Sequence, residues 1–231
     1  MKIEIWSDIV CPWCYIGKRR LESALAEFDE DVELEWKSFE LDRSAPKKAD
    51  GPLDEALAKK YGMSLEKARQ MMAQMTDTAA QEGLEFDFAS AQGGNTFDAH
   101  RLLHLAKAKG LQAELKERLM SAYMVEGRPI SEPDELVELA AEVGLDADEA
   151  RRVLDGGAFE DAVRRDEAEA RQVGVRGVPF FLIDEEIGIP GAQPAETLLD
   201  VLQRVRAKSA NSTPAAEGTG DACDDGSCEV G

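Results

Sequence analysis

Residues 8–22 read DIVCPWCYIGKRRLE and place two cysteines, Cys11 and Cys14, three positions apart where an apolar run gives way to helical spacing. Residues 2–6 (KIEIW) begin with alternating apolar and charged residues, which indicates a strand. Residues 12–28 repeat their apolar positions at helical spacing and begin with a proline, which suits the first turn of a helix. The cysteine pair is therefore expected at a strand-to-helix junction.

A cysteine at this position has a defined chemistry. The start of a helix presents unpaired amides and the positive end of the helix dipole, and both stabilise a thiolate. We therefore expect Cys11 to be the nucleophile in disulfide exchange. Cys14 lies about one turn deeper, close enough to attack a mixed disulfide on Cys11 and too buried to compete with it for substrate. It is expected to be the resolving thiol.

Composition and charge narrow the function classes. The chain has 231 residues, 43% of them hydrophobic and 32% charged, so it is long enough to fold on its own core. Its net charge of −20 argues against nucleic-acid backbones and anionic membrane lipids as partners. No stretch approaches the roughly 20 apolar residues of a membrane span, and charged residues interrupt the first ten positions, where a secretory signal would be apolar. The expected location is cytoplasmic.

The other two cysteines, Cys223 and Cys228, lie in a small, polar and acidic tail, residues 209–231. In a reducing cytosol, closely paired cysteines are more often catalytic or metal-binding than structural. A disordered tail of this length could reach Cys11, and its aspartates should raise the pKa of the tail thiols and make them poor leaving groups. We expect Cys223 and Cys228 to be a second redox pair that re-reduces Cys11–Cys14 or rests as a disulfide. An acidic exposed tail and a metal-binding tail are the alternatives.

The order of the elements defines the fold class. Residues 32–39 indicate a second strand, residues 44–157 read as helix after helix, and residues 178–192 hold two short apolar runs typical of a hairpin. Within the helical block, the segment SEPD at 131–134 is typical of a capping box, and Asp146 is typical of a helix cap. The sequence predicts an α/β protein with a thioredoxin-like fold and a large inserted all-helical domain. The expected parts are a thioredoxin-like domain (1–43 and 158–208), a helical insertion (44–157) and the tail (209–231).

Four motifs resemble one family. CPWC at 11–14, GVP at 177–179, NTFDAHRLLHLA at 95–106 and GAQP at 191–194 are similar to the DsbA-like branch of thioredoxin-fold oxidoreductases, in particular the FrnE-like group. The resemblance covers residues 1 to about 208. It implies that Pro179 is cis and sits against the cysteine pair, and that Val178 offers its backbone to an extended peptide or to glutathione. Pro12, Trp13, Val178 and Pro179 are the residues expected to contact substrate.

The resemblance implies a disulfide reductase or isomerase that needs no cofactor and acts on protein or small-molecule disulfides, with glutathione a further candidate partner. Because Trp13 brings no charge, we expect a less oxidising pair than in the strongest DsbA-type enzymes. The sequence leaves the oligomeric state open.

Two other functional classes remain open for this chain. Kappa-class glutathione transferases and 2-hydroxychromene-2-carboxylate isomerases are similar in fold, but have a serine in place of the first cysteine. They also have an acidic residue after the glycine of the last strand, where this chain has Gln193. The other class is a zinc-binding module, in which the four cysteines together form a zinc site.

Further residues have a structural and a functional interpretation. His100 and His104 lie four apart on one helical face, which suits metal ligands, but no third ligand is evident and packing is favoured. Gly17 inside a helix indicates close backbone packing near the site or nothing at all. Five methionines at helical spacing are interpreted as core residues, with an apolar substrate groove kept as a hypothesis: Met71, Met72, Met75, Met120 and Met124.

Overall fold

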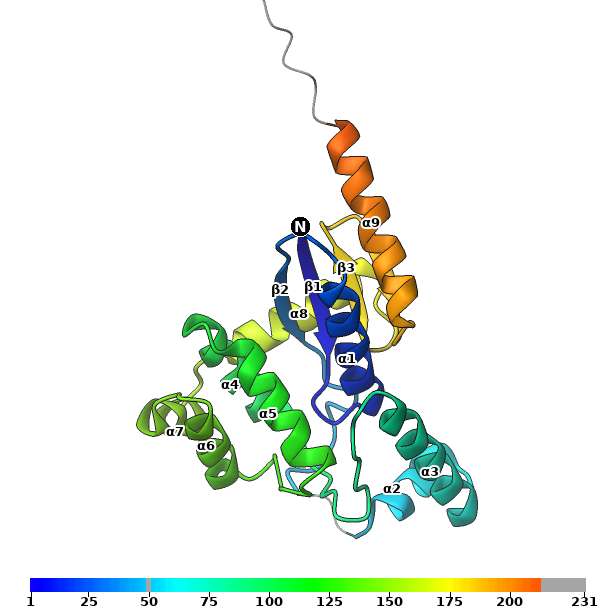
Figure 1. Cartoon of the computed structure of the whole chain (residues 1–231). Coiled ribbons are helices and arrows are strands. Elements are labelled where there is room, and N and C mark those ends of the chain that lie inside the picture. Colours follow the sequence, from blue (N-terminus) through cyan, green and yellow to red (C-terminus); the bar gives the residue numbers. More distant parts are fainter. Residues whose placement is uncertain (49–50, 213–231) are drawn as a thin grey trace, which may run out of the picture.

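The computed structural model describes residues 1–48 and 51–212, so Cys223 and Cys228 lie outside the described residues (Figure 1). The strands are β1 (Lys2–Ser7), β2 (Glu33–Ser38), β3 (Phe180–Ile183) and β4 (Ile187–Pro190). The helices are α1 (Pro12–Ala26), α2 (Leu53–Tyr61), α3 (Leu65–Gln81), α4 (Phe97–Ala108), α5 (Gln112–Met124), α6 (Pro133–Glu142), α7 (Ala147–Asp155), α8 (Glu160–Val173) and α9 (Ala195–Ser212).

The strands form one four-stranded sheet in the order β2-β1-β3-β4. β1 pairs in parallel with β2 and antiparallel with β3, and β3 and β4 form the antiparallel hairpin that the sequence predicts. In the central strand, Ile5 lies beside Trp36 of β2 on one side and beside Phe181 of β3 on the other. The strand–helix–strand start and the helix–hairpin–helix end confirm the thioredoxin-like α/β fold.

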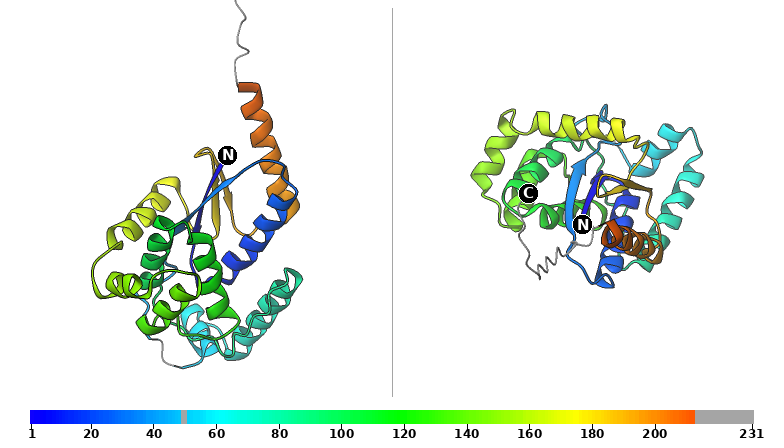
Figure 2. Two further views of the ribbon diagram at one scale, coloured as in Figure 1. Left: turned by 60° about the vertical axis from the view of Figure 1, so that its left-hand side comes forward. Right: turned by 90° about the horizontal axis from the view of Figure 1, so that it is seen from above.

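Helices cover both faces of the sheet. Figure 2 shows the sheet between α8 on one side and α1 with α9 on the other. The alternation of side chains along β1 explains this: Ile3 and Ile5 point into a core with α1 and α9, whereas Trp6 points to the opposite face, where it packs with Ala170 of α8. The indole nitrogen of Trp6 also donates a hydrogen bond to the Asp166 carbonyl, at 2.9 Å.

The inserted helices gather beyond the end of β1 in two groups, α2–α3 and α4–α7 (Figure 1). The largest core cluster joins them to the start of α1, because Cys14, Tyr15 and Ile16 share it with buried leucines of α4 and α5. The insertion therefore packs directly against the segment that carries the cysteine pair. Among the described residues, no helix combines the length and apolar character needed to cross a membrane.

The helix ends follow the sequence signals with one exception. Asp146 caps α7 as predicted, its carboxylate accepting a hydrogen bond from the Glu149 amide at 2.7 Å. The capping box predicted at Ser131 is wrong: α6 begins at Pro133 after Glu132, which forms no side-chain cap bond. Proline favours the first helical position because it has no amide hydrogen to satisfy, and this moves the cap one residue along the chain.

Candidate active site

The cysteine pair lies at the junction of β1 and α1. Cys11 is the N-cap residue of α1, with an extended backbone (φ −88°, ψ 112°), and Pro12 occupies the first turn as predicted. The Cys11 amide donates to the Asp8 carbonyl at 3.3 Å, and the Cys14 amide donates back to the Cys11 carbonyl at 3.0 Å. Both cysteines are free thiols and both are buried. The tight turn after β1 therefore places one sulfur at the helix start and the other one turn further in.

A second segment closes the site from the hairpin side. The Val178–Pro179 peptide bond is cis. The Cys11 sulfur lies 3.6 Å from the Val178 carbonyl oxygen, to which its thiol donates. The Pro179 carbonyl accepts a hydrogen bond from the Gly191 amide at 2.8 Å, which ties this segment to the end of β4. The structure thus brings together two segments that are more than 160 residues apart in the chain.

An apolar groove of about 520 Å³ opens beside Cys11. Cys11 borders it, whereas Cys14 lies behind and is not among its lining residues. Most of the large hydrophobic side chains that remain exposed in the described chain stand on its walls: Trp13, Leu41, Tyr61 and Met71. Met72, Met75 and Phe88 also line it. Trp13 itself is 42% exposed, so the residue between the two cysteines faces outward.

The apolar groove is therefore present, and three of the five methionines line it. Met71, Met72 and Met75 line the groove from α3, whereas Met120 and Met124 of α5 are fully buried core residues. The sequence offered both interpretations for all five. Which one applied to each residue depended on whether a neighbouring helix covered it.

The two sulfurs influence each other's titration. Interaction with the neighbouring Cys14 sulfur, together with burial, raises the pKa of Cys11 well above its ordinary value. Burial also opposes a charge on Cys14, but the interaction with Cys11 and the attraction of Lys116 outweigh it and lower the pKa of Cys14. The two thiols therefore titrate as a coupled pair, in which the loss of one proton makes the loss of the second harder. The nucleophilic thiolate on Cys11 stays a prediction. Cys11 differs from Cys14 in its access to the groove.

Behind the pair lies a buried set of charged residues that the sequence reasoning missed. Asp8 is buried, accepts a hydrogen bond from the Leu41 amide at 2.8 Å and lies 3.3 Å from the Nε2 atom of His100. Burial works to raise the pKa of Asp8, but the hydrogen bond and the charge of His100 outweigh it and leave that pKa lowered. Lys116 of α5 is fully buried beside them. Asp8 could have been noticed three residues before Cys11, whereas nothing marks Lys116 in the sequence.

The two histidines contact different acids. His100 is paired with Asp8, and the Nε2 atom of His104 lies 3.1 Å from Asp166 and 3.2 Å from the Ser38 hydroxyl. Within residues 1–48 and 51–212, no group of three metal-binding side chains comes together. The structure thus gives each histidine a packing partner of its own.

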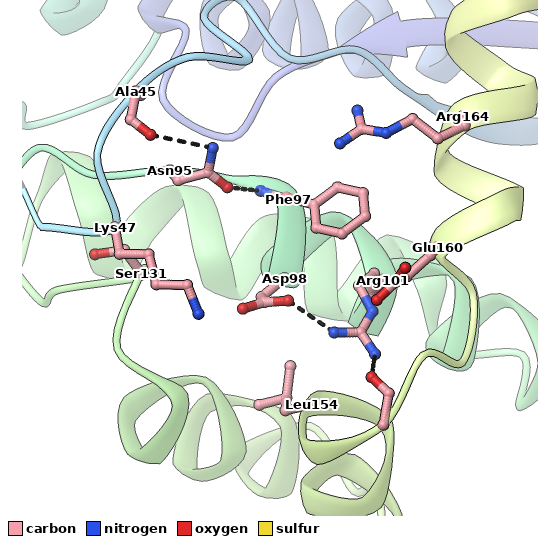
Figure 3. Close-up of a pocket in the computed structure, with 11 residues that line it drawn as sticks. Ala45, Lys47, Asn95, Phe97, Asp98, Arg101, Ser131, Leu154, Glu160 and Arg164 are labelled. Carbon is pink, nitrogen blue, oxygen red and sulfur yellow. Dashed lines mark hydrogen bonds and ion pairs between the residues drawn. The ribbon is translucent and has the colours of Figure 1, made fainter.

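A second cavity, of about 390 Å³, is lined by residues of α4, α7 and α8 and shares Ala45 with the groove (Figure 3). Arg101 enters it from α4, but its guanidinium is held by the Asp98 carboxylate at 2.8 Å and by the carbonyls of Val153, Gly156 and Ala158. Arg101 therefore joins α4 to the end of α7 and the start of α8. Neither cysteine reaches this cavity.

The fold and the site together define a thioredoxin-fold protein with two cysteines at the start of its first helix. A family model of the DSBA-like thioredoxin domain matches residues 2–203, and the chain belongs to this family. The predicted DsbA-like resemblance is thereby confirmed, while the FrnE-like group stays a prediction.

Individual proteins similar to this chain agree with the family assignment. A probable DsbA oxidoreductase from Streptomyces coelicolor is 42% identical, with a TM-score of 0.87 over 100% of this chain and 99% of that chain. YwbO from Bacillus subtilis, an uncharacterized protein, is 31% identical over 82% of this chain and 90% of its own length.

Two more distant structures share the fold alone. A 2-hydroxychromene-2-carboxylate isomerase is 16% identical, with a TM-score of 0.67 over 91% of this chain and 98% of its own. The cytosolic disulfide reductase DsbM from Pseudomonas aeruginosa is 19% identical, with a TM-score of 0.64 over 90% of this chain and 100% of its own, and has also been solved with GSH.

Proposed function

We propose that the chain is a thiol–disulfide oxidoreductase in which Cys11 and Cys14 cycle between dithiol and disulfide. The observation that carries this proposal is the difference in access between two adjacent sulfurs: Cys11 borders the groove and Cys14 lies behind it. Cys11 attacks a substrate disulfide, forms a mixed disulfide and releases one substrate thiolate. Cys14 then attacks the Cys11 sulfur, which forms the Cys11–Cys14 disulfide and releases the second substrate thiolate.

The groove favours protein segments as substrates. Its walls carry exposed aromatic and methionine side chains, and methionine adapts to apolar partners of different shape. Val178 stands at the groove beside Cys11, where its backbone could pair with an extended peptide. Pro12 and Trp13 border the same opening and complete the proposed substrate contacts. Small disulfides would use only the part of the groove next to Cys11.

We propose that the enzyme works as a reductase or isomerase in the cytoplasm, with glutathione or another thiol supplying electrons. The absence of charge at Trp13 and the net charge of −20 support a soluble enzyme with a moderately oxidising pair. The DsbM structure with GSH supports testing glutathione first.

A glutathione-dependent transferase or isomerase is the alternative, since an isomerase shares the fold. Two observations weigh against it. This chain has Cys11 where those enzymes have serine, and the Gln193 side chain donates a local hydrogen bond to the Pro190 carbonyl at 2.8 Å. A zinc site from all four cysteines would need Cys11 and Cys14 as ligands, and measuring the metal content of the purified, reduced protein tests it.

The tail pair remains a proposal from the sequence alone. If Cys223 and Cys228 re-reduce Cys11–Cys14, the double variant Cys223→Ser, Cys228→Ser keeps its first, stoichiometric reduction of substrate and slows in later turnovers. In Cys14→Ser, mass spectrometry should then find Cys11 linked to a tail cysteine. Full multiple turnover in the double variant, without such a linked peptide, would exclude this role.

The decisive experiment compares insulin reduction, recovery of a scrambled disulfide protein and glutathione conjugation by the wild type and Cys11→Ser. The proposal expects the first two activities in the wild type and neither in Cys11→Ser. Glutathione conjugation without disulfide turnover would support the alternative enzyme class.

A further inference from the structure

Lys116 is a buried cation without a carboxylate partner. Its side chain lies on α5 and is completely covered. Its ammonium group forms one long hydrogen bond, 3.4 Å, to the Ser7 carbonyl and lies 5.6 Å from the centre of the Trp36 ring. In the part of the chain that the structure describes, no acidic side chain comes within ion-pair distance of it.

Other buried cations of this protein are paired. Lys18 forms ion pairs with Glu22 and with Glu117, the latter at 2.6 Å. Arg101 is paired with Asp98 at 2.8 Å. An ammonium group taken out of water without a partner costs several kcal/mol, so such groups occur rarely unless something compensates their charge. Lys116 therefore needs a compensating negative charge.

The groups that face Lys116 identify this charge. They are Asp8 from the turn after β1, Cys11, Cys14 and Lys18 from α1, and, through its contact with Asp8, His100 of α4. Ser7 links Lys116 to the end of β1, since the Ser7 carbonyl accepts the hydrogen bond from Lys116. Burial lowers the pKa of Lys116 to about 8, against the raising effect of Cys14, Asp8 and Cys11.

We propose that Lys116 is the counter-ion of the thiolate formed on the Cys11–Cys14 pair, and that it releases its proton when that thiolate is consumed. The inference rests on the proposed redox function and adds a residue of the inserted helices to it. A basic residue behind the cysteines stabilises the reduced pair and holds Cys14 in the form that attacks.

In the resolving step one disulfide bond forms and another breaks. The Cys14 thiolate attacks the Cys11 sulfur, so the Cys11–Cys14 bond forms and the bond from Cys11 to the substrate sulfur breaks. The substrate sulfur leaves with the electron pair and takes a proton from solvent. The cysteine pair is now a neutral disulfide, so Lys116 faces only Asp8 as a negative charge and gives one proton to solvent.

The test is Lys116→Met, which removes the charge and keeps an unbranched apolar side chain. The ultraviolet absorbance of the thiolate, followed against pH in the reduced protein, should show its midpoint raised by about one pH unit or more. Lys18→Met is the matched control, because it removes a buried lysine of α1 that has its own carboxylate partners. Its midpoint should stay close to that of the wild type.

The dithiol–disulfide equilibrium of the protein with glutathione provides a second measurement. Loss of a group that stabilises the thiolate makes the reduced form less stable, so the equilibrium of Lys116→Met should move toward the protein disulfide by about tenfold, which is about 30 mV for this two-electron couple. A purely structural lysine would change the melting temperature and leave this ratio unchanged.

A folded Lys116→Met with the wild-type thiolate midpoint and the wild-type glutathione equilibrium would overturn the inference while leaving the proposed function intact. If the wild type itself does not cycle between dithiol and disulfide, the proposed function fails instead. Should Lys116→Met not fold, Lys116→Gln, which is also neutral and can still donate to the Ser7 carbonyl, is measured in the same two ways and has the same deciding outcomes.

Discussion

Gly17 of α1 lies directly against Pro179: a Cβ atom at position 17 would come within 2.9 Å of the Pro179 ring. It would also touch Ala192 and Phe181, each at 3.4 Å. The helix that carries the cysteines and the segment that faces them are therefore in contact through a position where only glycine fits without displacement. This is why a glycine is found in the middle of an otherwise regular helix.

Gly17→Ala tests this contact. Alanine favours a helix by about 1 kcal/mol over glycine, but forcing a methyl group into a packed site costs about 1 to 3 kcal/mol. We expect no gain in melting temperature and a several-fold loss of disulfide turnover, because Pro179 must move away from α1. Gly157→Ala serves as the control, since its added methyl group would make only ordinary contacts with Glu160. A more stable and fully active Gly17→Ala would contradict the contact.

The two cysteines should react differently with an alkylating reagent. Cys11 borders the groove and Cys14 does not, so iodoacetamide at mildly acidic pH should label Cys11 first. Cys11→Ser should abolish disulfide exchange, and Cys14→Ser should accumulate mixed disulfides with substrate. Peptide mapping after brief labelling measures this order. Equal labelling of both thiols would mean that access does not separate their roles.

The positions of the two cysteines can be predicted from the sequence because the signals that place them are local. Proline after Cys11, alternation in β1 and helical spacing in α1 are all contained in the first 28 residues, and they are sufficient to place the two sulfurs at a helix start. Gly17 also gave a correct signal, since a glycine inside a helix indicates close packing. The cis Val178–Pro179 bond beside Cys11 could be inferred only from the family resemblance.

The charge distribution could not be predicted in the same way. It depends on Lys116, which is about a hundred residues from the cysteines, carries no motif and looks like any lysine of an amphipathic helix. Its burial follows from how α5 packs against the start of α1, which is a property of the tertiary structure. The assignment of the thiolate to Cys11 from the helix dipole alone left Lys116 out of account, and it stays a prediction.

Met71 allows the groove to be tested separately from the chemistry. It lies on the groove wall, is 36% exposed and belongs to α3, whereas both cysteines lie on or beside α1. Met71→Gln keeps the length of the side chain and removes its apolar character. Loss of about 1 kcal/mol of apolar contact should raise the KM for insulin roughly fivefold. The rate with glutathione disulfide, which covers less of the groove than a protein segment does, should change less.

Val173→Gln is the matched control for Met71→Gln. Val173 is 41% exposed at the end of α8 and does not line the groove. Both variants add the same polar side chain to the protein surface, so a change in KM confined to Met71→Gln would assign the effect to the groove. Equal KM values for insulin in the wild type and Met71→Gln would show that protein substrates do not use this wall.

The shifted pKa of Lys116 should also make the free energy of unfolding depend on pH. Its pKa is about 8 in the folded protein and 10.5 for an unperturbed lysine. Between these values the unfolded chain holds a proton on Lys116 that the folded chain has lost, so the free energy of unfolding should rise with pH across this window. The rise attributable to Lys116 is about 3 kcal/mol at most, and it should be absent in Lys116→Met.

The redox state should change this dependence, which separates the counter-ion role from simple burial. In the disulfide form Lys116 loses the negative charge of the thiolate, so its pKa should fall further and the stabilisation on raising the pH should begin at a lower pH than in the reduced protein. Denaturant unfolding of the oxidised and reduced wild type at a series of pH values measures the two windows. The free energies of unfolding of Lys116→Met, measured in the same way, are subtracted to remove the titration of other groups. Coincident windows in the two redox states would show that the ammonium group does not interact with the cysteine pair.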